Sequence, residues 1–147
     1  MRVKLFPVCS PDYRLRLGAI KRAHDLLKGV LLHSEREPWR LWFKAAGVRI
    51  AQPQRGPTFS DAALLLSAAV SGQGIALARD VLVQRDLTAG RVVRLLDASI
   101  PSTCAYHAVF VRRAARPEVE SFVEWLVAEC KGGQLSRPAI KASRRQQ

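Results

Sequence analysis

The stretch from residue 56 to residue 78 restricts the fold more than any other part of this sequence. It begins with Gly56-Pro57, continues through the apolar segment 62–71, and reaches a second apolar run, 75–78, after Gly72-Gln73-Gly74. Glycine commonly ends a helix, and a short, fully apolar run is typical of a buried strand. We therefore expect strand, helix and strand in succession, which is the repeating unit of an α/β sheet with crossover connections.

The start of this helix is the first candidate ligand site. Ser60 is expected to be the N-cap of the helix, with Asp61 in the first turn, where its charge complements the helix dipole. Free backbone N–H groups beside a hydroxyl and a carboxylate suit a polar small molecule. Phe59, Ser60 and Asp61 are therefore candidate ligand contacts, and a ligand amino or amide group is as compatible with Asp61 as a carboxylate. The alternative is that Ser60 only caps the helix and Phe59 only packs in the core.

Hydrophobic periodicity places further strands and helices along the chain. Strands are expected at 5–9, 30–32, 48–50, 92–95 and 105–111, and helices at 19–28, 39–46, 81–89 and 117–130. The last of these helices is the most clearly amphipathic, with Phe122, Val123 and Leu126 on one face and Glu120 and Glu124 on the other. The alternation of short strands and helices again predicts an α/β fold.

The size and composition are those of one ordered domain, or of about one and a half small lobes. The 147 residues are 48% hydrophobic, and no apolar run approaches the ~20 residues that span a bilayer. The cysteines Cys9, Cys104 and Cys130 are scattered and have no metal-binding spacing. We expect a cytoplasmic protein with no metal, no cofactor and no membrane partner. No Gly-x-Ser-x-Gly elbow is present, and we expect no enzymatic activity.

A net charge of +12 would favour a nucleic-acid partner, but the distribution of the basic residues along the chain weakens this interpretation. Residues 1–55 hold 12 basic and 4 acidic side chains, whereas residues 56–130, which include the candidate site, hold 7 and 8. The remaining basic residues lie in 131–147, which we expect to be a disordered tail. A basic protein that associates non-specifically with nucleic acid through 1–55 and this tail remains an alternative.

Several blocks of sequence occur in a characteristic order. They are Leu5-Phe-Pro-Val-Cys-Ser-Pro11, Asp25-Leu-Leu, Leu31-Leu-His33, Trp39-Arg-Leu-Trp-Phe43, Gly56-Pro-Thr-Phe59, Ala68-Ala-Val-Ser-Gly-Gln-Gly-Ile-Ala-Leu77, Leu87-Thr-Ala-Gly-Arg-Val-Val-Arg-Leu95, Tyr106 and Phe122-Val-Glu-Trp-Leu126. Their order and spacing, over about residues 4–130, resemble the effector-binding domain of LysR-type transcriptional regulators. The branch that they resemble is that of the glycine-cleavage activator and the β-lactamase inducer regulator.

The resemblance implies a type 2 periplasmic-binding-protein-like fold, in which two α/β lobes joined by two crossover strands enclose a small-molecule effector. Residues 1–130 would form part of this domain. Within it, residues 10–104 would be the second lobe, 5–9 and 105–111 the crossovers, and 118–130 a helix of the first lobe. Tyr106, on the second crossover, joins Phe59, Ser60 and Asp61 as a candidate effector contact.

The resemblance also implies partners. Members of the family are homo-oligomers that bind promoter DNA through a helix-turn-helix, which has no counterpart in this sequence, and sense a small molecule in the cleft. The effector class stays open among an amino acid, an aromatic acid and a cell-wall fragment. With half of the cleft wall absent, we expect weak effector binding and an exposed apolar face on helix 118–130. A solute-binding module of related fold is a further alternative.

Overall fold

The computed structural model describes residues 3–50, 55–104, 107, 109 and 116–132. The chain forms two compact units, Arg2–Ala105 and Tyr106–Gln147 with Met1. The larger unit holds a sheet with its helices, and helix α5 (Pro117–Gly132) belongs to the smaller one. Among the described residues, no helix combines the length and apolar character that a membrane crossing needs.

The strands and helices of the larger unit alternate, as an α/β fold requires. Its strands are β1 (Lys4–Cys9), β2 (Leu31–Ser34), β3 (Thr58–Phe59), β4 (Ile75–Arg79), β5 (Val93–Arg94) and β6 (Ile100–Pro101). Its helices are α1 (Pro11–Leu17), the 3₁₀ helix η1 (Ala23–Lys28), α2 (Trp39–Ala45), α3 (Ala62–Val70) and α4 (Asp80–Thr88).

The sheet is mixed, with strand order β3-β2-β4-β1-β5, and β6 pairs with β1 beside this path. β2 pairs in parallel with β3, with His33 opposite Thr58, and with β4, with Leu31 opposite Ile75. β1 runs antiparallel to β4, β5 and β6. The parallel strands β2, β3 and β4 therefore end at the same side of the sheet.

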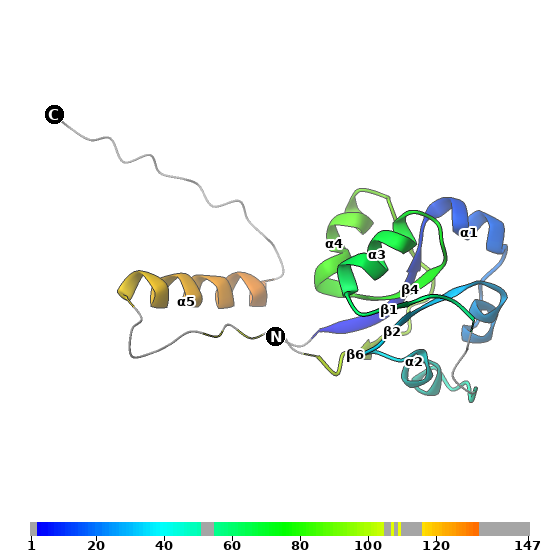
Figure 1. The fold of residues 1–147 in the computed structure, drawn as a ribbon, viewed down its shortest axis with the longest axis horizontal. Helices are drawn as coiled ribbons and strands as arrows, with labels where there is room; N and C mark the ends of the chain where they lie inside the picture. The colour runs from blue at the N-terminus through cyan, green and yellow to red at the C-terminus, as the bar shows by residue number, and fades with distance from the viewer. Residues whose placement is uncertain (1–2, 51–54, 105–106, 108, 110–115, 133–147) are drawn as a thin grey trace. The chain divides into compact units, whose positions relative to one another are not determined.

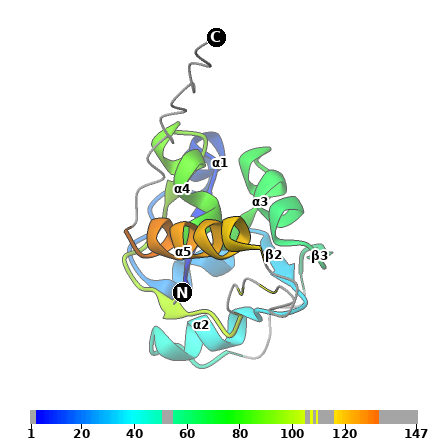
Figure 2. The ribbon, with the colours of Figure 1, turned by 90° about the vertical axis from the view of Figure 1, so that its left-hand side faces the viewer.

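Helices cover both faces of the sheet. Figure 1 and the end-on view in Figure 2 show α3 and α4 on one face and α2 on the other. The α2 face buries Trp39, Trp42 and Phe43, whose rings contact one another at centroid distances of 5.3–6.0 Å. Alternate residues of the strands, such as Leu31 and Leu32, enter the two different core clusters. Two-sided burial explains why the strands read as nearly continuous apolar runs.

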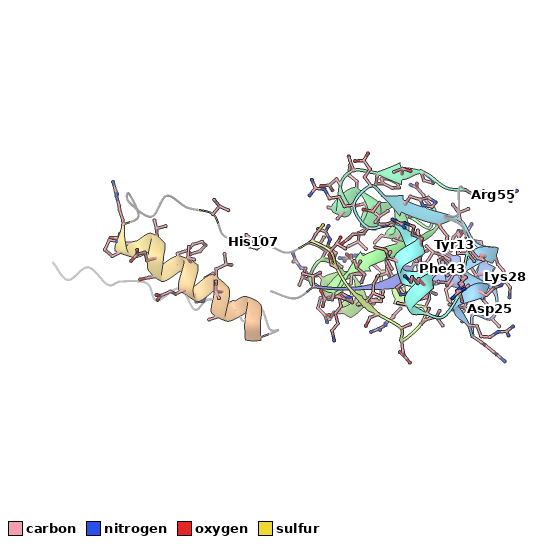
Figure 3. The ribbon with its side chains drawn as sticks, turned by 90° about the horizontal axis from the view of Figure 1, so that it is seen from below. Tyr13, Asp25, Lys28, Phe43, Arg55 and His107 are labelled. Atoms are coloured by element: carbon pink, nitrogen blue, oxygen red, sulfur yellow. The ribbon has the colours of Figure 1, made fainter. Side chains whose placement is uncertain are left out.

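The α/β prediction is confirmed, but two local predictions are wrong and one helix was not predicted. Residues 48–50 form no strand, and the helix expected at 19–28 is only the short η1, where Asp25 pairs with Lys28 (Figure 3). Helix α1 was missed although it carries a start signal. Ser10 is its N-cap, with its Oγ accepting from the Tyr13 N–H at 3.2 Å, and Pro11 is its first residue.

The N-cap predicted for the central helix is wrong by one residue. Asp61, rather than Ser60, caps α3, and its Oδ1 accepts from the N–H groups of Ala63 at 2.8 Å and Leu64 at 2.9 Å. The N-cap of α4 is Arg79, and Asp80 lies in the first turn. The hydroxyl of Ser60 therefore has no role in starting α3.

Replacing Asp61 and Ser60 in turn tests which residue starts α3. We expect Asp61→Ala to lower the free energy of unfolding by about 1 kcal/mol, because two N–H groups lose their acceptor. Ser60→Ala changes an exposed side chain and is expected to stay within ~0.5 kcal/mol of the wild type. Urea denaturation followed by tryptophan fluorescence measures both values, and the reverse ranking would contradict this cap.

Candidate functional site

The candidate site lies where the three parallel strands end. Ser34 ends β2, Phe59 ends β3 and Arg79 ends β4. We call this side of the sheet, with the residues that directly follow the strands, the carboxyl edge. Because β2 separates β3 from β4, Phe59 and Arg79 are about 10 Å apart along the edge. Open α/β sheets commonly bind ligands outside the carboxyl ends of their strands.

Three of the four predicted contact residues lie together on this edge. Phe59 is half-buried and packs against the core beneath α3, and its carbonyl accepts from the Glu35 N–H at 3.2 Å. Ser60 and Asp61 follow it directly and are exposed. The fourth residue, Tyr106, lies outside the described residues, as does most of the predicted crossover 105–111.

A close backbone contact positions β3 beside β2. Gly56 has φ +124°, and a Cβ at this position would lie 1.9 Å from the carbonyl oxygen of Leu31. The Pro57 carbonyl then accepts from the His33 N–H at 2.9 Å. Only glycine permits this approach, so the Gly-Pro pair noted in the sequence holds Phe59 at the carboxyl edge.

The structure adds residues that sequence reasoning missed. Glu37 is only 4% exposed, and its Oε2 accepts from the Nε of Arg79 at 3.1 Å. Its other oxygen, Oε1, accepts from the Ser102 hydroxyl. In the sequence, Glu37 stands in a charged segment just before Pro38 and is typical of a polar turn. No local signal indicates that this carboxylate is buried.

The electrostatics of the edge favour a hydrogen-bond donor on the ligand. Asp61 already accepts from two N–H groups at the start of α3, so this helix start is capped from within the chain. An anionic ligand group would meet the exposed Asp61 carboxylate, whereas an amino or amide group would be attracted to it. The structure thus weakens the argument for a bound carboxylate at this helix start.

A ligand at the carboxyl edge has to bind on its outer surface rather than in the cavity behind it. The small cavity behind the edge, lined by Glu37, Ala62, Leu65, Arg79 and Leu82, has a volume of about 10 Å³ and accommodates at most one water molecule. Among the residues that the structure describes, no group of three or more His, Cys, Asp or Glu side chains is arranged to hold a metal ion. The chemistry available is hydrogen bonding and charge, from Ser60 and Asp61 above all.

The comparisons with known proteins agree with this architecture. The family model described as the LysR substrate binding domain matches residues 1–131. The glycine cleavage system transcriptional activator of Escherichia coli K12 is 34% identical over 132 residues, which are 88% of this chain and 43% of that protein. The HTH-type transcriptional activator AmpR of Citrobacter koseri is 34% identical over 122 residues, 82% of this chain and 41% of that protein.

Solved structures extend the similarity to the fold. The effector domain of the transcriptional regulator AmpR of Pseudomonas aeruginosa superimposes with a TM-score of 0.69 at 25% identity, covering 90% of this chain and 66% of that one. Such effector domains have a type 2 periplasmic-binding-protein-like fold. The chain spans less than half the length of the relatives it matches by sequence, and these relatives are transcriptional regulators rather than enzymes. By its match over residues 1–131, the chain belongs to the LysR substrate-binding domain family.

Proposed function

We propose that this chain senses a small-molecule effector and that the carboxyl edge is one wall of the effector site. The observation that carries the proposal is the placement of Phe59, Ser60 and Asp61 together at the end of β3, with both polar side chains exposed. Tyr106 is proposed as a fourth contact because the family resemblance implies that it lies on the second crossover strand. In a full-length regulator, effector binding would shift the population between open and closed arrangements of the two lobes.

The lobe boundaries are part of this proposal. The larger unit ends at residue 105, one residue beyond the expected second lobe of 10–104, and this supports a crossover that starts there. We assign 5–9 and 105–111 to the crossovers and 118–130 to the first lobe. Homo-oligomers and promoter DNA are the proposed partners of the full-length regulator, with DNA bound through a helix-turn-helix.

We infer that the effector carries an amino or amide group next to Asp61. The exposed carboxylate attracts such a donor, and the Ser60 hydroxyl both donates and accepts beside it. Amino acids and peptide-bearing cell-wall fragments carry this group, whereas a simple aromatic acid does not. The first two classes are therefore favoured over the third.

Thermal denaturation with three probes tests the effector class. Glycine, a muramyl dipeptide and benzoate represent the three classes, and a ligand that binds only the folded protein raises Tm. We expect a rise with an amino- or amide-bearing probe and none with benzoate. We also expect a dissociation constant of ~1 mM, because the described edge supplies only one wall. Stabilisation by benzoate alone would contradict the assignment.

Removing the charge of Asp61 without removing the cap sharpens this test. Asparagine is as good an N-cap as aspartate, so Asp61→Asn is expected to leave Tm unchanged and to weaken probe binding about tenfold. Asp12→Asn removes the same charge from the first turn of α1, at the opposite side of the sheet, and should change neither value. Equal binding by wild type and Asp61→Asn would remove Asp61 from the site.

Helix α5 carries an exposed apolar face, which supports its assignment to a lobe interior. Phe122 is 58% and Trp125 41% exposed, and their rings lie 5.7 Å apart between centroids. Val119 and Val127 on the same helix are also exposed. Exposed apolar patches of this kind mark surfaces that contact other protein segments.

Binding of a hydrophobic dye measures this face. We expect the wild type to bind anilinonaphthalene sulfonate and Phe122→Gln to lose at least about half of the fluorescence, because the patch loses its most exposed ring. Leu15→Gln replaces an isolated apolar side chain, 80% exposed on α1, and should change the signal little. If the wild type binds no dye, or if both variants lose fluorescence equally, the assignment of α5 fails.

A further inference from the structure

A buried hydrogen-bond network at the carboxyl edge uses both oxygens of the Glu37 carboxylate. Oε2 accepts from the Nε of Arg79 at 3.1 Å, and Oε1 accepts from the Ser102 hydroxyl. The Ser102 Oγ in turn accepts from the Cys104 N–H at 3.0 Å. The network therefore joins the loop after β2, the end of β4 and the segment after β6.

Burial makes these contacts strong. The side chains of Glu37 and Arg79 are 3% and 12% exposed, so both charges are largely removed from water. A carboxylate at this depth needs its partners, because losing one of them leaves a buried charge uncompensated. The position of Glu37 is consequently held firmly, and so is that of any group that donates to it.

Ser102 stands next to both points at which the chain crosses the boundary of the larger unit. Its N–H donates to the Val3 carbonyl at 2.7 Å, close to the boundary at Arg2, and its hydroxyl accepts from Cys104, close to the boundary at Ala105. The pairing of β6 with the start of β1 brings these two segments together. A group that fixes the position of Ser102 therefore fixes both segments at which the chain enters and leaves the larger unit.

The loop that carries Glu37 is also bonded to the candidate site. The Glu35 N–H donates to the carbonyl of Phe59 at 3.2 Å, and the Arg36 carbonyl accepts from the Thr103 hydroxyl at 3.5 Å. Residues 35–37 thus contact β3 on one side and the segment 102–104 on the other. Such a contiguous path of hydrogen bonds is a physical basis for coupling, provided that the coupling is measured.

We propose that Glu37 is a positioning residue that fastens the segment 102–104, where the chain leaves the larger unit, to the carboxyl edge that binds effector. The role of this edge as an effector site rests on the proposed function. The fastening itself does not, because it is defined by contacts within the larger unit.

Alkylation of the native cysteines by iodoacetamide tests the proposal without an effector. Cys104 is half-buried beside Ser102, whereas Cys9 is fully buried and its pKa is raised by burial to about 11, against a smaller lowering by the charge of Arg14. The three cysteines fall in different tryptic peptides, so mass spectrometry follows each thiol separately. Cys104 reports the position of 102–104, and Cys9 reports unfolding of the whole unit.

We expect Glu37→Gln and Ser102→Ala each to raise the rate of Cys104 alkylation about tenfold, because a hydrogen bond to a charged group is lost, while Cys9 stays unreactive. Ser102→Thr keeps the hydroxyl and should restore the wild-type rate. Asp86→Asn breaks the exposed ion pair with Arg91 elsewhere in the unit and should leave Cys104 unchanged.

The outcomes separate positioning from general stability. An unchanged Cys104 rate in both Glu37→Gln and Ser102→Ala overturns the proposal, and so does parallel reaction of Cys9 and Cys104 in Ser102→Ala. If Glu37→Gln exposes Cys9 by itself, Ser102→Ala decides, because it leaves Glu37 paired with Arg79. Failure here would leave the effector probes and Asp61→Asn unaffected, so the two proposals fail independently.

Discussion

The parallel pairing of β2 with both of its neighbours is the constraint on which the rest of this structure depends. Two glycines make it possible, because a Cβ on Gly56 would lie 1.9 Å from the Leu31 carbonyl oxygen and one on Gly74 would lie 2.5 Å from that of Val30. Both contacts are at the amino end of β2. They allow β3 and β4, which follow these glycines, to pair with β2. The consequence appears at the other end of the sheet, where three strand ends and the loops after them are brought together.

The aromatic core on the α2 face of the sheet determines which residue of the loop after β2 becomes buried. The Trp39 indole N–H donates to the carbonyl of Leu32 at 2.9 Å, which fastens the first turn of α2 to β2. Because the chain passes from Ser34 to a fully buried Trp39 in five residues, the residue just before Pro38 is drawn inward as well. That residue is Glu37, and its charge requires Arg79 and the Ser102 hydroxyl as partners.

Features that depend on residues close together in the sequence could be predicted, whereas features that depend on contacts between distant residues could not. The apolar run 62–71 between glycine signals predicts α3 and its flanking strands because periodicity and chain-breaking residues act locally. The observed N-cap is Asp61 rather than the predicted Ser60. Both residue types are good caps, and the pairing of β3 decides which of the two stands at the start of the helix. Glu37 was not predicted as buried, since its partner Arg79 lies 42 residues further along the chain. The contacts that bury it exist only after the sheet has formed.

Two carboxylates at the carboxyl edge differ in their burial and in their hydrogen-bond partners. Glu37 is buried, and its two oxygens accept from the side chains of Arg79 and Ser102. Asp61 directs Oδ1 to backbone N–H groups of α3 but remains exposed, so a ligand can reach it. A ligand can form a hydrogen bond directly with an exposed carboxylate, whereas a buried carboxylate whose oxygens are already paired within the protein contributes to the structure. On this physical ground we propose ligand recognition for Asp61 and positioning for Glu37.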